Sequence, residues 1–288
     1  MRRSPLVLIP VAAALLLAAC GSSTTPSASG SSTGSASATC SPSSQQTLTP
    51  GKLTAATGNP AYSPWVIDDK PESGKGFEAA VTYAVAKKLG YTDADVVWIR
   101  TGFDEVIAPG PKKFDVNIQQ FGITDERKKA VDFSSGYYDL SQAVVTYKGS
   151  PIEKATTLAA LKDAKLGAAV GTTSLDAINA SIQPTTAPKV YGNNDDAVAG
   201  LKAKQIDGIV VDLPTAFYIA FGELDNGVLI GQLPNSADQK EQLGFLLAKG
   251  SPLTQCVSQA VDALRADGTL AKLQDQWLSA SAGAPVLS

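Results

Sequence analysis

The sequence predicts an α/β fold built as two lobes. Short apolar strands alternate with helical segments along the chain, and the connections between them are short, which favours mostly parallel sheets. The globular part extends from about residue 52 to residue 279, a length that forms two lobes more naturally than one. Because 44% of the residues are hydrophobic, a sizeable core is available.

The predicted elements follow from local periodicity. Strand-like apolar segments occupy 53–57, 96–99, 114–118, 143–147, 165–170 and 208–211. The first helix is indicated by apolar residues spaced for one helical face, namely Phe77, Ala80, Val81, Ala84, Val85 and Leu89. Gly90 ends this helix. A later amphipathic pattern, from Leu253 to Leu264, predicts a helix that carries Cys256.

Two segments are expected to leave a strand and enter a helix. These are 171–175, which reads Gly-Thr-Thr-Ser-Leu, and 124–127, which reads Thr-Asp-Glu-Arg. Hydroxyls and free N–H groups at a helix start suit a carboxylate or a phosphate. In open α/β sheets the ligand lies beyond the carboxyl ends of the strands, where both turns fall. Nucleotide sites are not indicated, because neither GxGxxG nor GxxxxGK[ST] occurs.

Composition excludes several function classes. The chain has no histidine, and its three cysteines include no CxxC pair, so Ser-His-Asp catalysis and zinc sites with histidine or clustered cysteine are excluded. We expect no cofactor and no metal. The net charge of -3 argues against a general nucleic-acid binder, so we expect no nucleic-acid partner.

The N-terminus predicts an extracytoplasmic, lipid-anchored protein. Arg2 and Arg3 precede an apolar run over 6–19, which is too short to span a bilayer as a helix. The run ends in Leu-Ala-Ala followed by Cys20, which resembles a bacterial lipobox. We therefore predict a signal peptide over 1–19, a lipid on Cys20 and attachment to the bacterial cell membrane. The alternative is an ordinary signal peptide that happens to end near a cysteine.

A tether is predicted over residues 20–51, and a short tail over 280–288. Fifteen of the 24 residues from 21 to 44 are Ser or Thr and none is charged, so this stretch cannot offset its ordering entropy. Two cysteines remain after lipidation, and the extracytoplasmic setting favours their oxidation. We predict a disulfide between Cys40 and Cys256, which would pin the end of the tether to the fold. The alternative is two free thiols.

One long segment carries a family resemblance. Residues 122–138 read GITDERKKAVDFSSGYY and closely resemble the signature of the polar amino-acid family of ABC-transporter substrate-binding proteins. Supporting segments, in the same order as in the family, are 76–78, 102–104, 112–115, 171–173, 207–212 and 267–270 with Trp277. The resemblance implies a two-lobe periplasmic-binding-protein (type II, Venus-flytrap) fold with the ligand in the cleft between the lobes. It places lobe 1 at 52–140 plus 238–279 and lobe 2 at 146–234, joined by two crossing segments.

The resemblance also implies roles for polar residues. Arg127 matches the arginine that clamps the ligand's α-carboxylate, for which a planar guanidinium offers two parallel charge-assisted bonds. Thr172 and Thr173 match the groups of lobe 2 that meet the same carboxylate, and Asp212 matches the acid that binds the α-ammonium. The alternatives are a solvated arginine and plain helix N-caps at Thr173 and Asp212.

Aromatic and amide residues complete the expected site. Tyr62 and Trp65 match the family's first aromatic contact region, and Phe103 matches the aromatic residue that sandwiches the ligand side chain. Core packing is the alternative for each. Gln119 and Gln120 follow a strand that reads as buried, so we expect them to face the cleft.

Four positions depart from the family pattern. Gly122 stands where many relatives have Ser or Thr, which removes a hydroxyl but leaves the backbone N–H. Gly58 and Asn59 stand where several relatives have an acid, which argues against a pocket specific for lysine or arginine. Ala169 replaces the lysine of the glutamine-binding protein. The signature therefore implies amino-acid binding without assigning the side chain.

The resemblance implies a substrate-binding lipoprotein of an ABC importer. It would capture an L-amino acid, expected to be polar as the family name indicates, and deliver it to a permease and ATPase complex. We expect a monomer that contacts the membrane through the lipid on Cys20, and no enzymatic activity. The alternatives are a sensory module that reports to a membrane receptor, and a periplasmic dehydratase on the same fold. A dehydratase needs a general acid, for which 104–105 and 195–196 offer paired carboxylates.

Overall fold

The computed structural model describes residues 40–234, 241–279 and 283–288. Contacts divide the chain into residues 1–37 and 38–288, and everything described below belongs to the second unit. The predicted signal peptide, Cys20 and the first part of the tether lie outside the described residues. In the part that is described, no helix is long and apolar enough to cross a bilayer.

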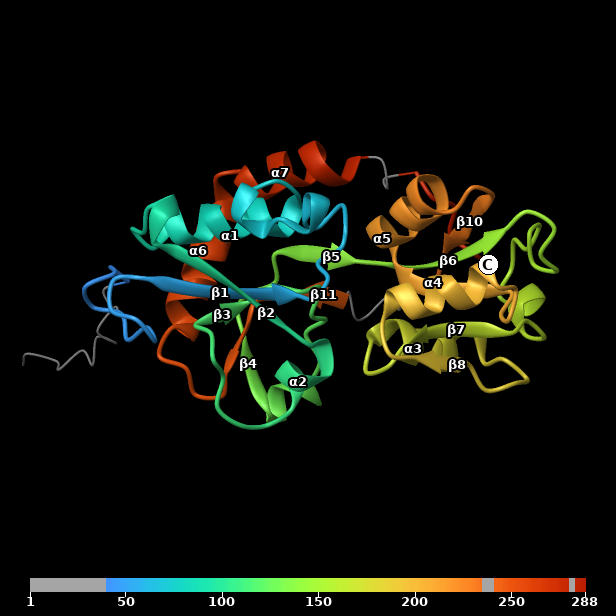
Figure 1. Ribbon diagram of the computed structural model, residues 1–288, viewed down its shortest axis with the longest axis horizontal. Coiled ribbons are helices and arrows are strands. Elements are labelled where there is room, and N and C mark those ends of the chain that lie inside the picture. The colour runs from blue at the N-terminus through green and yellow to red at the C-terminus, as the bar shows by residue number, and fades with distance from the viewer. Residues whose placement is uncertain (1–39, 235–240, 280–282) are drawn as a thin grey trace, which may run out of the picture. The chain divides into compact units, whose positions relative to one another are not determined.

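Lobe 1 is organised around a five-stranded sheet (Figure 1). Its strand order is β2 (Val96–Thr101), β1 (Leu53–Gly58), β3 (Val116–Asn117), β12 (Leu246–Ala248) and β4 (Val131–Phe133). Helices α1 (Phe77–Lys88), α6 (Thr254–Ala266) and α7 (Thr269–Leu278) lie on one side of this sheet, and the short α2 (Phe103–Ile107) lies on the other. The apolar face of α1 enters the core as predicted, with Val81 and Val85 fully buried.

Lobe 2 contains a second five-stranded sheet. Its order is β10 (Gly227–Gln232), β6 (Gln142–Tyr147), β9 (Gly208–Asp212), β7 (Leu166–Ala169) and β8 (Lys189–Tyr191). Its helices are α3 (Thr173–Ala177), α4 (Asn194–Lys202) and α5 (Leu213–Tyr218). Short 3-10 turns in the two lobes are Ile67–Asp69, Pro71–Ser73, Asp93–Asp95, Arg127–Lys129 and Ala159–Leu161, and π-helical turns are Ile178–Ile182 and Ile219–Glu223.

The expectation of mostly parallel sheets is wrong. In lobe 1, β1 is parallel to β2 and β3, but β12 is antiparallel to both of its neighbours. In lobe 2, β7 is parallel to β8 and β9, but β6 is antiparallel to both of its neighbours. The antiparallel strands β6 and β12 are those that follow a crossing from the other lobe. The alternation of strands and helices along the sequence gives no information about these crossings.

Two crossings connect the lobes. Along the first, β5 (Tyr138–Leu140) leads directly into β6, and along the second the chain returns from β10 to β11 (Glu241–Leu243). β5 and β11 pair with each other in an antiparallel two-stranded sheet. All strands of the first sheet fall within the predicted ranges of lobe 1. The strands of the second sheet fall within the predicted range of lobe 2, except that β6 begins at Gln142, four residues before that range. The limits of the lobes otherwise remain predictions.

The end of the chain packs against lobe 2. α7 ends lobe 1 at Leu278, yet residues 283–288 lie along the end of β10, where Gln232 donates to the carbonyl of Pro285 and accepts from the N–H of Leu287. Leu287 is 2% exposed within a core cluster of lobe 2. We predicted only a tail here, so this packing is a result of the structure.

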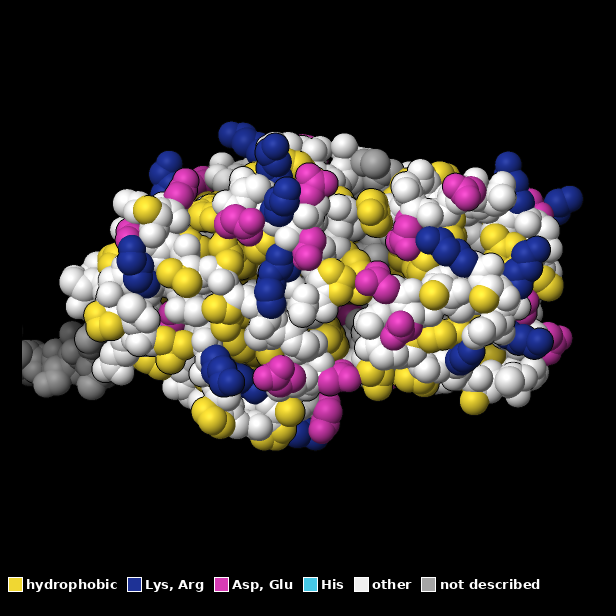
Figure 2. All heavy atoms as spheres, in the orientation of Figure 1, with side chains coloured by type: hydrophobic (Ala, Val, Ile, Leu, Met, Phe, Trp, Pro, Cys, Tyr) yellow, Lys and Arg dark blue, Asp and Glu magenta, His cyan; other side chains and the backbone are white. Residues whose placement is uncertain are grey.

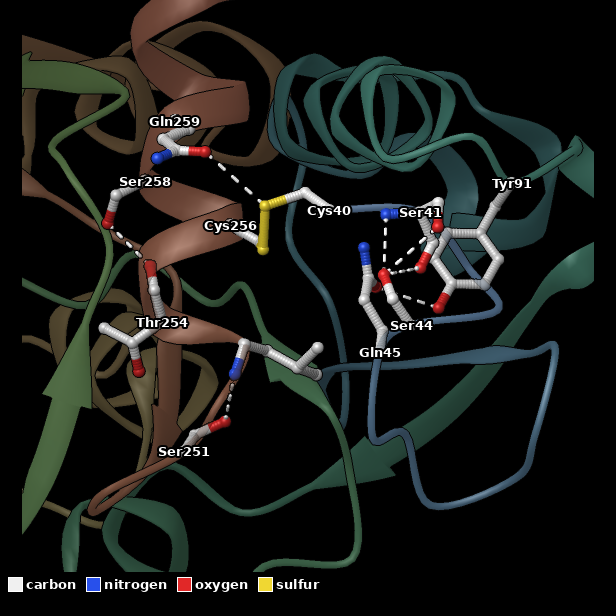
Figure 3. The surroundings of a disulfide bond; sticks show 11 residues. Cys40, Ser41, Ser44, Gln45, Tyr91, Ser251, Thr254, Cys256, Ser258 and Gln259 are labelled. Carbon is white, nitrogen blue, oxygen red and sulfur yellow. Dashed lines mark hydrogen bonds between the residues drawn. A yellow bond between two sulfur atoms is a disulfide. The ribbon is translucent and has the colours of Figure 1, made fainter. Parts of the chain in front are cut away.

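The predicted disulfide is present. Cys40 and Cys256 are joined with their Cα atoms 5.5 Å apart, which links the chain before β1 to α6 (Figure 3). Beside it, the hydroxyl of Tyr91 donates to Gln45 at 2.9 Å, and the N–H of Leu48 donates to Asp115 at 2.8 Å. The described end of the tether, 40–51, therefore lies against lobe 1.

Candidate functional site

Arg127 lies at the boundary between the lobes. It begins the 3-10 turn Arg127–Lys129, and its side chain is 9% exposed. One guanidinium nitrogen, Nη1, donates to the carbonyl of Gly122 at 2.7 Å, and Nη2 donates to the carbonyl of Gly171 in lobe 2 at 2.8 Å. The guanidinium carbon lies 5.4 Å from the centre of the Phe103 ring. Burial lowers the pKa of Arg127, whereas nearby carboxylates raise it, and Glu241 has the largest effect among them.

The local structure around Arg127 differs from our expectation. We predicted that 124–127 enters a helix, but the segment forms only one 3-10 turn before β4. Oγ1 of Thr124 accepts from the Arg127 N–H at 3.2 Å, so the hydroxyl serves the turn. The polar sequence of this segment is therefore used to present one buried side chain rather than to start a long helix.

Asp212 ends β9 on the opposite side of the cleft. It occupies the N-cap position of α5, but its carboxylate makes no capping hydrogen bond. The side chain instead accepts from Nε2 of Gln142 at 3.0 Å. Burial, and then the charge of Glu241, raise the pKa of Asp212 to about 8. A carboxylate in this setting is stabilised by a cation, such as an ammonium group, that approaches from the cleft.

The two threonines after β7 have different structural roles. Thr172 is the N-cap of α3, where its Oγ1 accepts from the N–H of Leu175 at 3.3 Å and donates to the carbonyl of Ala169 at 2.8 Å. The alternative of a plain N-cap thus applies to Thr172, whereas Thr173 is the first residue of the helix. Oγ1 of Thr173 accepts from Nε2 of Gln142 at 3.3 Å. Both threonines line the cleft.

Two of the three predicted aromatic residues face the cleft. Phe103 stacks on Phe121 with ring centres 4.9 Å apart, and Tyr62 lines the opposite part of the wall. Burial, followed by the charge of Asp195, raises the pKa of Tyr62, so the phenol stays neutral. Trp65 does not line this cavity. Its ring is fully buried within a core cluster of lobe 1.

Gln119 and Gln120 line the cleft as expected. Gln120 has a φ of 50°, a left-handed conformation that needs support in a residue with a side chain. Glu78 supplies it, accepting from the Gln120 N–H at 2.8 Å and also from its side-chain amide. The sequence analysis assigned no role to Glu78. Its position inside the apolar face of α1 was the available signal, since a fully buried carboxyl requires partners.

These side chains surround a cavity of about 280 Å³ between the lobes. Its lining residues are Asn59, Pro60, Tyr62, Thr101, Gly102, Phe103, Gln119, Gln120, Arg127, Ala169, Val170, Thr172, Thr173, Ser174, Gly192, Asn193, Asn194, Val211 and Asp212. Eight of the ten predicted ligand-binding residues belong to this set. Trp65 and Gly122 do not. The lining from 192 to 194 has only turn-forming residues, which offered no functional signal in the sequence.

Gly122 lies behind the wall rather than in it. A Cβ at this position would approach Oε1 of Glu241 to 2.7 Å and Cγ2 of Thr173 to 3.0 Å. The departure from Ser or Thr at position 122 therefore makes room for the Glu241 carboxylate. Glu241 was not predicted, because it follows the second crossing and carries no motif.

Carboxylates outnumber basic groups around the cleft. The acids that act electrostatically on Arg127 are Glu241, Asp176, Asp212 and Asp104. Arg127 is the only Lys or Arg among the described lining residues. On the face drawn in Figure 2, acidic side chains lie on both sides of the boundary between the lobes. The site thus combines one guanidinium, which two backbone carbonyls hold in place, with several carboxylates around it.

Known proteins are similar to this chain in sequence and in fold. The chain is 29% identical over 226 residues to the L-arginine-binding protein of Pseudomonas aeruginosa, a match that covers 76% of this chain and 85% of the relative. It resembles the structure of an ancestral arginine-binding protein bound to arginine, with 31% identity, a TM-score of 0.66 and coverage of 79% and 98%. It also resembles an ancestral amino acid-binding protein described as a precursor of cyclohexadienyl dehydratase, with 30% identity, a TM-score of 0.63 and coverage of 79% and 95%.

The match to a family model extends over both lobes. It covers residues 54–280, which include the two five-stranded sheets, apart from Leu53 at the start of β1, and every described lining residue of the cleft. The chain belongs to the bacterial extracellular solute-binding proteins, family 3.

Proposed function

We propose that this protein is the substrate-binding component of an ABC importer and captures an L-amino acid in the cleft between its lobes. One observation carries the proposal. Arg127 and Asp212 bring a guanidinium and a carboxylate to the same cavity from different lobes. An α-amino acid is a zwitterion, so this pair complements its carboxylate and its ammonium.

Capture proceeds by closure of the lobes. The amino acid docks on lobe 1, where Arg127 pairs with its carboxylate and Phe103 covers its side chain. Lobe 2 then brings Thr173 and Asp212 onto it. Because these contacts exist only in the closed state, the ligand shifts the equilibrium toward closure. The closed form is the one delivered to the permease.

The proposed side chain is polar and not acidic. Arg127 is engaged by the α-carboxylate, and no other described lining residue is a Lys or Arg that would neutralise a second carboxylate. Oε1 of Gln119 is buried without a hydrogen-bond partner among the described residues, so it suits a donor on the ligand. Glutamine and arginine both carry such donors, and relatives in the comparison are described as binding arginine.

A thermal-shift screen of the mature protein against the twenty amino acids tests this function, with calorimetry of each hit. A ligand that binds the folded state raises the melting temperature by mass action. We expect one or a few polar amino acids to raise it and aspartate and glutamate to have no effect. If none of the twenty does so, even after unfolding and refolding to remove co-purified ligand, the proposal is wrong.

The same preparation distinguishes the alternatives. The resemblance to a dehydratase precursor makes a cyclohexadienyl acid the substrate to test for turnover. A binding protein leaves it unchanged, whereas an enzyme releases product. Recovery of a permease in pull-down experiments supports transport, and recovery of a receptor kinase instead supports a sensory role.

We also propose that a lipid on Cys20 anchors the protein outside the cytoplasm. The lipobox-like sequence supports this proposal. Labelling of cells with a fatty-acid probe should mark the wild-type protein, and Cys20→Ala should lose both the label and the membrane fraction. A Cys20→Ala protein that remains labelled would contradict it.

A further inference from the structure

Gln142 lies directly behind the residues that line the cleft and is not itself one of them. It is the first residue of β6, where the first crossing enters lobe 2, and it is 4% exposed. Its Nε2 lies 3.0 Å from Oδ1 of Asp212 and 3.3 Å from Oγ1 of Thr173. Its Oε1 accepts from the hydroxyl of Ser174 at 2.6 Å, which fixes the direction of the amide. One side chain thus contacts both proposed ligand-binding residues of lobe 2.

The same amide reaches the second crossing. Oε2 of Glu241, the first residue of β11, lies 3.3 Å from Nε2 of Gln142. Oε1 of Glu241 is buried and has no hydrogen-bond partner among the described residues. A single nitrogen therefore lies within 3.3 Å of three acceptors, on Asp212, Thr173 and Glu241. Its two N–H groups can serve two of them at a time, and Asp212 is the nearest.

We propose that Gln142 is a positioning residue that orients Asp212 and Thr173 for the ligand. Its amide also offsets the repulsion between the carboxylates of Asp212 and Glu241, which favours an ionised Asp212. This inference rests on the proposed function, because it assigns Asp212 to the α-ammonium. Gln142 touches no ligand in this arrangement. It acts through the direction and charge of the residues that do.

The groups around Asp212 act on its pKa in opposite directions. Glu241 from β11 and Glu78 from α1 raise its pKa, whereas Arg127 and the hydrogen bond from Gln142 lower it. Tyr137, before β5, also lies within electrostatic range of Asp212. Loss of the Gln142 amide should therefore raise the pKa of Asp212, and loss of the Glu241 charge should lower it.

Titration of Asp212 in the full mature protein without ligand tests the proposal directly. Carboxyl carbon NMR gives the pKa of Asp212 in the wild type, Gln142→Leu, Gln142→Glu and Glu241→Gln. We expect Gln142→Leu to raise it by about one unit and Glu241→Gln to lower it by about one unit, the size of a nearby hydrogen bond or charge. Gln142→Glu, which keeps an acceptor for Ser174 but adds a charge, should raise it further.

Gln242→Ala is the matched control on β11. The Gln242 side chain donates to Asp139 at 2.7 Å rather than to Asp212, so its replacement should leave the pKa of Asp212 unchanged. Calorimetry with L-arginine and L-glutamine from pH 6 to 9 then follows affinity. Below the pKa of Asp212, affinity for a bound probe should fall up to tenfold per pH unit, with the midpoint moved upward in Gln142→Leu and downward in Glu241→Gln.

Opposite pKa shifts support the proposal, whereas an unchanged pKa in Gln142→Leu and Gln142→Glu overturns it. A lower melting temperature with an unmoved titration means that Gln142 only supports the fold, and it overturns the proposal too. Should Gln142→Leu fail to fold, Gln142→Met, which also lacks an N–H donor but keeps an unbranched side chain, takes its place with the same expected shift. If neither probe binds but the shifts are opposite, the effect of Gln142 on Asp212 is supported and the proposed ligand class is what fails.

Discussion

The indole nitrogen of Trp65 in lobe 1 donates to Oγ1 of Thr215 in lobe 2, at 2.7 Å. Both side chains are buried, and the tryptophan ring also packs edge-on against Tyr138 with centres 5.6 Å apart. The hydrogen bond therefore joins buried side chains of the two lobes, and neither of them lines the described cavity. We expect this contact to break when the lobes separate, which would make it a contribution to the closed state.

Trp65→Phe should weaken capture without emptying the core. The phenylalanine ring keeps most of the packing but leaves the hydroxyl of Thr215 without its donor, at a cost of about 1–3 kcal/mol. We expect a lower ligand affinity in calorimetry and a larger open fraction by distance measurement between labelled lobes. Thr215→Val, which removes the acceptor, should have a similar effect. An unchanged open fraction in both variants would contradict the role.

Arg127→Ala should abolish most of the binding. Removing the guanidinium leaves a ligand carboxylate in the cleft without its counter-charge, which costs roughly 2–5 kcal/mol. The dissociation constant measured by calorimetry checks this, and an affinity loss below tenfold would rule out the assigned role. Arg265→Ala is the control, because Arg265 donates to the carbonyl of Gly136 outside the cleft and should affect stability rather than affinity.

Glu78 should make the protein less stable as the pH rises toward neutrality. Burial raises the pKa of this carboxyl to about 7, from 4.5, against hydrogen bonds from Tyr137 and Gln120 that lower it. Between these values the folded state binds more protons than the unfolded state, so the free energy of unfolding falls with rising pH, by up to roughly 3 kcal/mol. The stabilisation is complete below pH 4.5 and lost above about pH 7.

Glu78→Gln measures this contribution. Asp212 changes stability in the same direction, so only the difference between wild type and variant isolates Glu78. In chemical denaturation from pH 4.5 to 8, the variant should show a flatter dependence of unfolding free energy on pH. Parallel curves for the two proteins would mean that Glu78 does not titrate in this range.

Loss of the disulfide should destabilise the fold and leave the cleft intact. The bond closes a loop with a sequence separation of 216 residues, for which the chain-entropy model gives about 5 kcal/mol. Neither Cys40 nor Cys256 lines the cleft. The double variant Cys40→Ala, Cys256→Ala should therefore melt at a lower temperature but bind the ligand with nearly unchanged affinity below that temperature. A large loss of affinity would instead connect the disulfide to closure.

Leu287→Ala should destabilise lobe 2 from the far end of the chain. The side chain is buried beside Ile230 and Leu233, so its truncation leaves a cavity and costs about 2–4 kcal/mol. Denaturant unfolding measures this loss, and Val286→Ala is the control because Val286 is 60% exposed. Equal stability of the two variants would mean that residues 283–288 contribute nothing to the core.

Several elements could be predicted because their signals are local. The spacing of Phe77, Val81 and Val85 predicted α1, and the apolar run at 208–211 predicted β9. The pairing of Cys40 with Cys256 followed from the inferred compartment and from the small number of cysteines. Arg127 was identified because its motif is contiguous. Apart from the disulfide, the information lies within a few residues of the feature that it predicts.

Other features depend on where the chain returns after a long excursion. The alternating α/β pattern, a length sufficient for two lobes and the polar turns after the strands could all be inferred from the amino-acid order. The burial of Trp65, the space that Gly122 leaves for Glu241 and the packing of residues 283–288 against lobe 2 emerged from the folded structure. Helical and strand periodicity could not reveal these contacts, because periodicity describes one segment against a generic core. Which side chains meet across the cleft, such as Gln142 with Glu241, is set by how the two crossings bring distant segments together.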